Sequence, residues 1–305
     1  MCLPSNMELR IENLTKTYPN GVRALNGVTL TIPRGLFGLL GPNGAGKSSL
    51  MRTIATLQEP DTGSIHFGDI DVLREKDAMR RRLGYLPQEF GFYPTLSAEA
   101  TLEHFAALKG IADPKARREI VGHLLQQVNL YDARKKNVGG YSGGMRQRLG
   151  IAVALLGSPE VIIVDEPTAG LDPTERHRFL NLLSEVGENV VVILSTHIVE
   201  DVRELCERMA IIAQGQVVAQ GSPEEVIGAV RGRMWKRVFQ KAELDEARSR
   251  YHVVSTRLVA GKPVLFVYSD GQPGADFTPV EADLEDAYFF HTAAAGARPA
   301  EAAIA

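Results

Sequence analysis

The chain has no apolar run that is long enough to cross a membrane. Runs such as Leu36–Leu40, Val161–Val164 and Val190–Leu194 have four or five residues, whereas a membrane-spanning helix needs about 18. The first seven residues contain no apolar core of a signal peptide either. We therefore expect a soluble, cytoplasmic protein, and any role at a membrane must come through a partner.

Cysteine is scarce, and basic residues are not in excess. Cys2 and Cys206 are the only two cysteines, too few for a disulfide framework or a metal-binding cysteine pattern, which suits a reducing compartment. The formal net charge is −3 at pH 7. That balance gives no electrostatic reason to expect nucleic acid as the main partner.

One glycine-rich stretch carries the clearest signal, and it fits the phosphate-loop spacing G-x-x-x-x-G-K-[ST]. It reads Gly41-Pro42-Asn43-Gly44-Ala45-Gly46-Lys47-Ser48-Ser49. A buried strand is predicted before it and a helix over residues 48–57 behind it. Its glycines allow backbone N–H groups to turn toward an anion, and the helix N-terminus adds positive potential.

Lys47 and Ser48 give this loop its expected chemistry. The lysine can reach the β- and γ-phosphates of a nucleotide, and the Ser48 hydroxyl can ligate Mg²⁺. The alternative is a glycine-rich turn with an exposed lysine. Because a strand is predicted before the loop and a helix after it, we predict nucleotide binding.

A second motif follows the predicted buried strand at Val161–Val164, which ends in Asp165 and Glu166. In a parallel sheet the C-terminal strand ends face the ligand crevice, as the phosphate loop does. Asp165 can hold Mg²⁺ directly or through water, and Glu166 can orient and polarise the attacking water. The alternative is a strand that meets solvent and ends in charge.

The order of predicted elements indicates the fold class. Strands and helices alternate along residues 8–228, interrupted by a mostly helical stretch from Ser97 to about Ser158, so we predict an α/β core with a helical insert of about 60 residues. After Gly228 the sequence becomes more polar and charged, and strands are predicted at 253–256 and 264–268 and a helix at 282–291. The alanine-rich last dozen residues are predicted to be frayed or disordered.

A third motif, Ser142-Gly143-Gly144, opens a predicted helix and, taken alone, is explained by an ordinary serine cap. The ordered set of motifs nevertheless resembles the ATP-binding cassette (ABC) ATPases of membrane transporters over about residues 8–228. The motifs that carry the resemblance are Tyr18, the phosphate loop, Gln88, Ser142-Gly143-Gly144, Asp165-Glu166, Leu171-Asp172 and His197. The resemblance implies a P-loop NTPase core with an antiparallel β subdomain, an ABC domain over residues 1–228 and a helical subdomain over about 88–158.

The resemblance also implies the ligands, ATP and Mg²⁺, and roles for single residues. Tyr18 is expected to stack on adenine, and Gln88 to ligate Mg²⁺ or the water and to sense the membrane partner. His197 is expected to contact the γ-phosphate and to act in catalysis with Glu166, Gln88 and Lys47. Each has an ordinary alternative: a turn tyrosine, a surface amide and a helix-capping histidine.

Further residues are expected to act across a dimer. Ser142, Gly143 and Gly144 would contact ATP held by the other subunit, and Asp172 would shape the dimer seam, although a Leu-Asp-Pro turn before a helix explains Asp172 equally well. Met145 departs from the family pattern, which commonly has Gln there. A thioether cannot donate a hydrogen bond, so the Met145 side chain offers no donor for a polar contact to the nucleotide across the dimer.

Residues 229–305 are predicted to form a small α+β extension. Gly232-Arg233-Met234-Trp235 and Leu284-Glu285-Asp286-Ala287-Tyr288 resemble the C-terminal extension of ATPases that serve ABC-2 type transporters, mostly exporters. The alternative is a generic appendage. By this resemblance the partners are a second copy (or a paralogous ATPase) and a membrane permease that holds the protein on the inner face of the cell membrane.

Two other functions compete with a transporter motor. Soluble ABC ATPases of translation usually carry two cassettes in one chain, and only one is present here. DNA-repair ATPases insert a long coiled coil, but only 95 positions separate Lys47 from Ser142. A non-hydrolysing regulator is disfavoured because Glu166 and His197 are both present.

Overall fold

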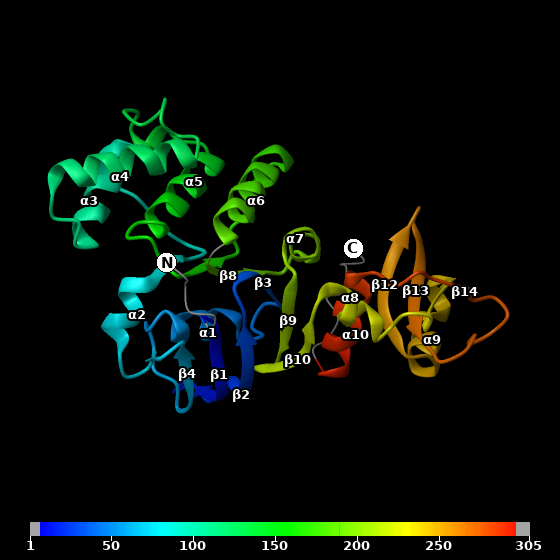
Figure 1. Cartoon of the computed structure of the whole chain (residues 1–305). Coiled ribbons are helices and arrows are strands. Elements are labelled where there is room, and N and C mark those ends of the chain that lie inside the picture. The colour runs from blue at the N-terminus through cyan, green and yellow to red at the C-terminus, as the bar shows by residue number, and fades with distance from the viewer. Residues whose placement is uncertain (1–6, 189, 297–305) are drawn as a thin grey trace.

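The computed structural model describes residues 7–188 and 190–296 and shows three sheets with helices around them (Figure 1). Cys2 and the last alanine-rich residues, 297–305, lie outside the described residues, so the predictions made for them are not addressed. Among the described residues, no helix is both long and apolar enough to span a membrane.

The central sheet has six strands in the order β10-β9-β3-β8-β7-β6 and is parallel except for the edge pair β9–β10. Its strands are β3 (Gly35–Leu40), β6 (Leu83–Leu86), β7 (Val161–Asp165), β8 (Val191–Thr196), β9 (Arg208–Ala213) and β10 (Gln216–Gly221). Parallel pairing places the C-terminal ends of β3, β7 and β8 at one edge. This edge carries the phosphate loop, Asp165-Glu166 and His197.

The strands of the central sheet are apolar on both faces. Alternate residues point to opposite faces, so Val161 and Ile163 of β7 pack into one buried cluster, whereas Ile162 and Val164 pack into another. A parallel sheet that is covered on both sides needs such continuous apolar strands. The predicted strands 161–164 and 190–194 therefore correspond to β7 and β8.

One face is covered by α1 (Lys47–Ile54) and by an antiparallel sheet in the order β2-β1-β4-β5. The other elements on this side are β1 (Leu9–Thr17), β2 (Arg23–Ile32), β4 (Thr62–Phe67), β5 (Ile70–Asp71) and α2 (Lys76–Arg82). Both β1 and β2 extend well beyond the predicted strands 8–13 and 28–32. The sequence pattern did not reveal α2 or β5.

The other face carries α6 (Pro173–Gly187), α7 (Val199–Leu205) and the helical insert. The insert consists of α3 (Ala98–Leu108), α4 (Pro114–Gln127), the short 3-10 turn η1 (Val138–Gly140) and α5 (Gly143–Ala154), and its three α-helices pack on one another. Ser97, Asp113 and Ser142 each cap a helix through a side-chain oxygen.

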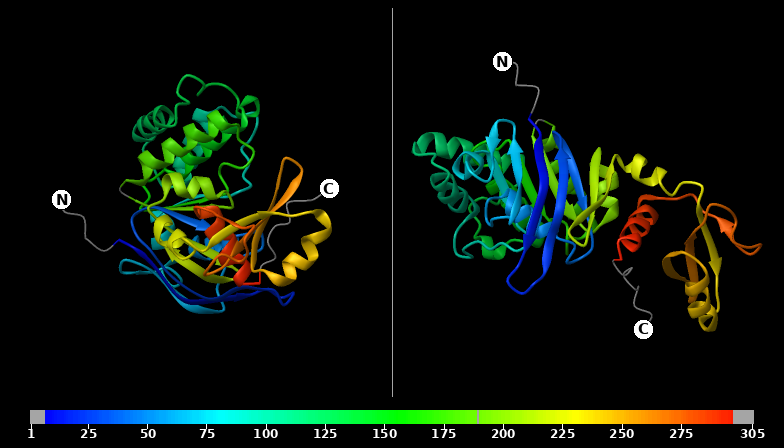
Figure 2. Two further views of the ribbon diagram at one scale, coloured as in Figure 1. Left: turned by 90° about the vertical axis from the view of Figure 1, so that its right-hand side faces the viewer. Right: turned by 90° about the horizontal axis from the view of Figure 1, so that it is seen from below.

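After α8 (Pro223–Gly228) the chain forms a third sheet in the order β12-β13-β11-β14 and then a last helix. This extension contains β11 (Met234–Val238), η2 (Lys241–Glu243), α9 (Leu244–Arg250), β12 (Val253–Val259), β13 (Lys262–Tyr268), β14 (Thr278–Pro279) and α10 (Leu284–Ala294). Figure 2 shows the sheet beside the cassette and α10 between the two. The boundary at residue 228 stays a prediction, and α10 packs on both sides of it.

Candidate functional site

The shape of the phosphate loop depends on two glycines, Gly41 and Gly46, at positions where a side chain would not fit. Gly46 precedes α1 with φ 109°, a left-handed conformation that favours glycine. A Cβ atom on Gly46 would overlap the carbonyl oxygen of Ala24, and one on Gly41 would overlap that of Ile212. The loop is therefore pressed against β2 and β9, which fixes its backbone at the start of α1.

Lys47 is the buried cation of the site, with its side chain only 6% exposed. Its Nζ donates a hydrogen bond to the carbonyl of Gly41 at 2.5 Å and lies 3.6 Å from Glu166 Oε1. Burial lowers the pKa of the Lys47 ammonium, and the carboxylates of Glu166 and Asp165 oppose that shift. A buried ammonium in this position can bind an anionic phosphate strongly because little water screens it.

Glu166 links the lysine to the histidine. Its Oε2 lies 2.7 Å from His197 Nδ1, and its backbone N–H donates to the carbonyl of Ser195 at 2.8 Å. The residue has φ 49°, a left-handed conformation that costs a non-glycine residue about 1–3 kcal/mol and is concentrated at functional sites. The backbone conformation therefore places the buried Glu166 carboxylate at the C-terminal ends of β7 and β8, between Lys47 and His197.

Asp165 is the last residue of β7 and is 4% exposed. Its Oδ1 is buried and has no hydrogen-bond partner among the described residues, and such an orphaned oxygen fits a cation. The exposed Ser48 lies at the start of α1. No group of three or more His, Cys, Asp or Glu side chains among the described residues could hold a metal, but Mg²⁺ is often bound by one carboxylate together with substrate phosphates.

Tyr18 follows β1 and is joined to the helix behind the phosphate loop. Its hydroxyl lies 3.0 Å from Ser49 Oγ and 3.0 Å from Gln58 Oε1. Gln58 in turn donates to the carbonyl of Ser49 at 2.7 Å. Gln58 was not predicted from the sequence. This network places the half-buried Tyr18 ring beside the loop, where a base could stack on it.

Ser142, Gly143 and Gly144 lie apart from this group, at the start of α5 in the helical insert. Ser142 Oγ accepts a hydrogen bond from the backbone N–H of Met145 at 3.2 Å. Among the described residues, no hydrogen bond or ion pair joins this segment to Lys47 or Glu166. The Met145 side chain packs against the apolar cluster under the insert, so only its backbone takes part in the cap.

Gln88 and Asp172 are both exposed. Gln88 lies in the loop after β6, and no hydrogen bond of its side chain is formed with another described residue. Asp172 caps α6, where its Oδ1 accepts from the backbone N–H of Glu175 at 3.0 Å. The structure thus shows the ordinary capping role of Asp172, and its role at a dimer seam stays a prediction.

A buried network that the sequence did not reveal ties the Asp165–Asp172 segment to the helix after His197. Asp201 of α7 is fully buried and accepts from Thr168 Oγ1 at 2.7 Å and from Arg176 Nε at 2.7 Å. A buried carboxylate needs such partners. The sequence shows Asp201 only as an acidic residue within a predicted helix. Local patterns do not distinguish such a buried carboxylate from one at the surface.

The cassette part of the chain is similar to many ABC proteins. The family model described as ABC transporter matches residues 25–169. The chain is 38% identical to the ABC transporter ATP-binding protein YxlF of Bacillus subtilis, with 72% of each chain covered. It is 34% identical to the daunorubicin/doxorubicin resistance ATP-binding protein DrrA of Streptomyces peucetius, over 91% of this chain and 81% of that one.

A solved structure shows the same fold and a related nucleotide state. The dimeric ATP-binding cassette MJ0796, bound to ADP and Pi in a post-hydrolysis state, matches with a TM-score of 0.64 and 28% identity. The match covers 70% of this chain and 98% of that one. The predicted α/β cassette fold with its helical insert is thereby confirmed, and within it Lys47 of the phosphate loop, Glu166 and His197 lie close together. The chain belongs to the ABC transporter family, as an ATP-binding subunit that hydrolyses ATP.

Proposed function

We propose that this ATPase is the motor of an exporter, that two copies close around two ATP molecules, and that each active site uses residues from both copies. The observation that carries the proposal is the division of the motifs. Lys47, Asp165, Glu166 and His197 meet at one edge of the central sheet, whereas Ser142–Gly144 opens a helix of the insert. A second copy could bring its Ser142–Gly144 to the γ-phosphate that the first copy holds.

Within one site, the residues divide the work of phosphoryl transfer to water. Glu166, held by His197, would accept a proton from the attacking water and orient it. Lys47 and the N–H groups of the loop would stabilise the charge on the phosphates. Ser48, Gln88 and Asp165 are the residues that would hold Mg²⁺, which neutralises phosphate charge when it is bound.

Lys47→Ala is expected to weaken ATP binding about ten- to a hundredfold, because it removes charge-assisted contacts worth roughly 1.5–3 kcal/mol each. Calorimetric titration with ATP measures the change. Lys16→Ala is a matched control, since Lys16 of β1 forms its ion pair with Asp61 in the part of the chain that the structure describes. Equal ATP affinity in the Lys47→Ala variant and the wild type would contradict the role proposed for the loop.

Relatives support the export part of the proposal. DrrA, which aligns with most of this chain, including much of the extension, is named for resistance to daunorubicin and doxorubicin. A second relative is named for linearmycin resistance. We propose by analogy that this chain drives a separate membrane permease of the ABC-2 type and lies on the inner face of the cell membrane through that permease.

The loop after Gln88 offers a surface for the permease. Phe92 packs edge-on against Phe90 at 5.4 Å and against Phe105 of α3 at 6.2 Å, so the loop is anchored to the insert. Next to this anchor, the Tyr93 side chain is 71% exposed. A large aromatic side chain held out by a fixed loop suits an interface, where tyrosine is enriched.

Co-expression with an ABC-2 type membrane permease, sought first in the neighbouring reading frames, tests the permease partner. The wild-type chain should sediment with membranes and co-purify with that protein in detergent, and Tyr93→Ala should reduce the co-purified amount at least fivefold. Tyr131→Ala is the matched control, because Tyr131 is also an exposed tyrosine. Its ring differs from that of Tyr93 in packing against Arg134, whose Cζ lies 3.9 Å from the ring centroid. A wild-type chain that stays in the supernatant would contradict the proposal.

A further inference from the structure

The last helix of the extension, α10, packs on the cassette. It contacts α7, α8, β9 and β10 as well as β12 of its own sheet. Leu284, Ala287 and Tyr288 are at most 8% exposed and lie in the same apolar cluster as Val202 and Met209 of the cassette. Figure 1 shows α10 beside α8 and β10. Its apolar face is thus part of the cassette core.

The opposite side of α10 is fixed to the extension. Arg257 of β12 donates to Asp286 Oδ1 at 3.1 Å and lies 3.2 Å from Glu285 Oε2. Asp286 is 2% exposed, so its charge depends on that arginine. Phe290 stacks on Tyr268 of β13 with ring centroids 4.6 Å apart. The helix therefore joins the extension sheet to the cassette as one packed unit.

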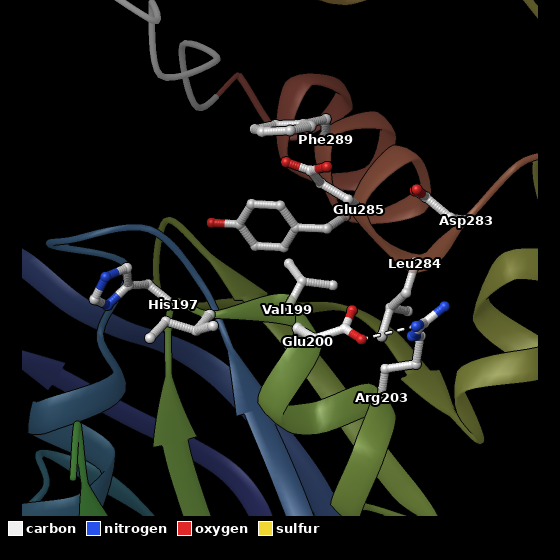
Figure 3. A pocket seen from close by; sticks show the side chains of 10 residues that line it. His197, Val199, Glu200, Arg203, Asp283, Leu284, Glu285 and Phe289 are labelled. Atoms are coloured by element: carbon white, nitrogen blue, oxygen red, sulfur yellow. Dashed lines mark hydrogen bonds and ion pairs between the residues drawn. The ribbon is translucent and has the colours of Figure 1, made fainter. Parts of the chain in front are cut away.

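The helix that α10 contacts, α7, begins two residues after His197. Between them lies a cavity of about 370 Å³ that is lined on one side by His197, Val199 and Glu200 and on the other by Glu285 and Tyr288. Figure 3 shows Val199 pointing toward α10, whereas the ring of His197 extends to the other side, away from that helix. The C-terminal extension thus reaches the segment that holds Glu166.

Tyr288 is an α10 residue that is both buried and part of the cavity wall that His197 also lines. Burial raises the pKa of its hydroxyl to about 12, and the negative charge of Glu166 adds to that shift. The aromatic ring is buried beside α7 and lines the cavity with His197.

On its other side, α7 is held by Asp201, which binds Thr168 and Arg176. The helix also packs on β3 and β8 of the central sheet, so α10 covers the side of α7 that the sheet and the Asp165–Asp172 segment leave open. Without the α10 contact we expect the segment around His197 to shift relative to Glu166, because α7 begins two residues after His197. The phosphate loop is held separately, by the close packing of Gly41 against β9 and of Gly46 against β2.

We propose that Tyr288 is a positioning residue for ATP hydrolysis: by packing against the His197 segment it keeps His197 on Glu166, and through it the C-terminal extension controls turnover without contacting ATP. The inference rests on the roles proposed above for Glu166 and His197. A partner that moves the extension would change the rate of hydrolysis and leave ATP affinity unchanged.

The test compares single-turnover hydrolysis and ATP affinity of the full chain. Tyr288→Ala should lower the hydrolysis rate at least tenfold, with the dissociation constant for ATP within twofold of wild type. Tyr288→Phe, which keeps the ring, should retain at least half of the rate. Phe290→Ala is the matched control, because it removes an aromatic ring from the same helix on the side that faces the extension, and its rate should stay within threefold.

Tyr288→Leu covers the case in which the alanine variant does not fold, since leucine keeps an apolar side chain in the core. It should show the same tenfold loss with unchanged ATP affinity. Wild-type rates in the Tyr288→Ala or Tyr288→Leu variant would overturn the inference, as would equal losses in the Phe290→Ala control. Absence of hydrolysis in the wild type itself would instead count against the proposed site.

Discussion

Glu166→Gln is expected to lower the rate of ATP hydrolysis about 10²–10⁴-fold, the range that a positioned general base contributes. The amide keeps the shape of the side chain but loses the charge that polarises water. The substitution also removes the carboxylate that lies 3.6 Å from Lys47 Nζ and 2.7 Å from His197 Nδ1, so Lys47 loses an ion-pair partner and His197 a carboxylate hydrogen-bond partner. ATP binding should persist because the phosphate loop is untouched.

Steady-state hydrolysis and calorimetric ATP binding measure the two effects separately. Glu200→Gln is the matched control, because Glu200 lies in the first turn of α7 and, among the described residues, forms its ion pair with Arg203 at the surface. Its rate should stay within twofold of wild type. Normal hydrolysis in the Glu166→Gln variant would mean that another group activates the water.

Mixing two inactive variants is expected to restore hydrolysis. Lys47→Ala disables the phosphate loop, and Ser142→Arg places a large cation at the start of α5. If each site takes Lys47 from one copy and Ser142 from the other, a mixed dimer has both lesions in one site and none in the second. Single-turnover hydrolysis should then rise well above background at equal mixing, because each mixed dimer has one intact site of its two.

Single-turnover measurement is used because coupled sites can both be needed for steady turnover. Each variant alone serves as the control and should stay at background. If mixed dimers form on addition of ATP and no cleavage returns, every site contains a lesion, and the motifs are then supplied within one chain.

The local parts of the site could be predicted from the sequence because short segments determine them. The phosphate loop depends on glycines and on the strand and helix that flank it, so its place between β3 and α1 follows from spacing. The apolar run that ends in Asp165 and Glu166 likewise predicts a buried strand with carboxylates at its end. Both features are determined by residues that are neighbours in the sequence.

The long-range parts could not be predicted in this way. A helix was expected over residues 282–291, but no local pattern shows that Leu284 and Tyr288 pack against α7 of the cassette. The strand β11 was missed because Lys236 and Arg237 make it look like a surface segment, and it is specified by pairing with β13 and β14. The partners of Asp201 were missed because they come from distant positions along the chain.

The molar mass of the Glu166→Gln variant in solution tests the central claim most directly. Light scattering during size exclusion, with ATP and Mg²⁺ present, should give twice the mass of one chain, and the same variant without nucleotide should give the mass of one chain. Adding Lys47→Ala to the variant should abolish the dimer. A variant that binds ATP and yet keeps the mass of one chain at every protein concentration would contradict an ATPase that closes around ATP as a dimer.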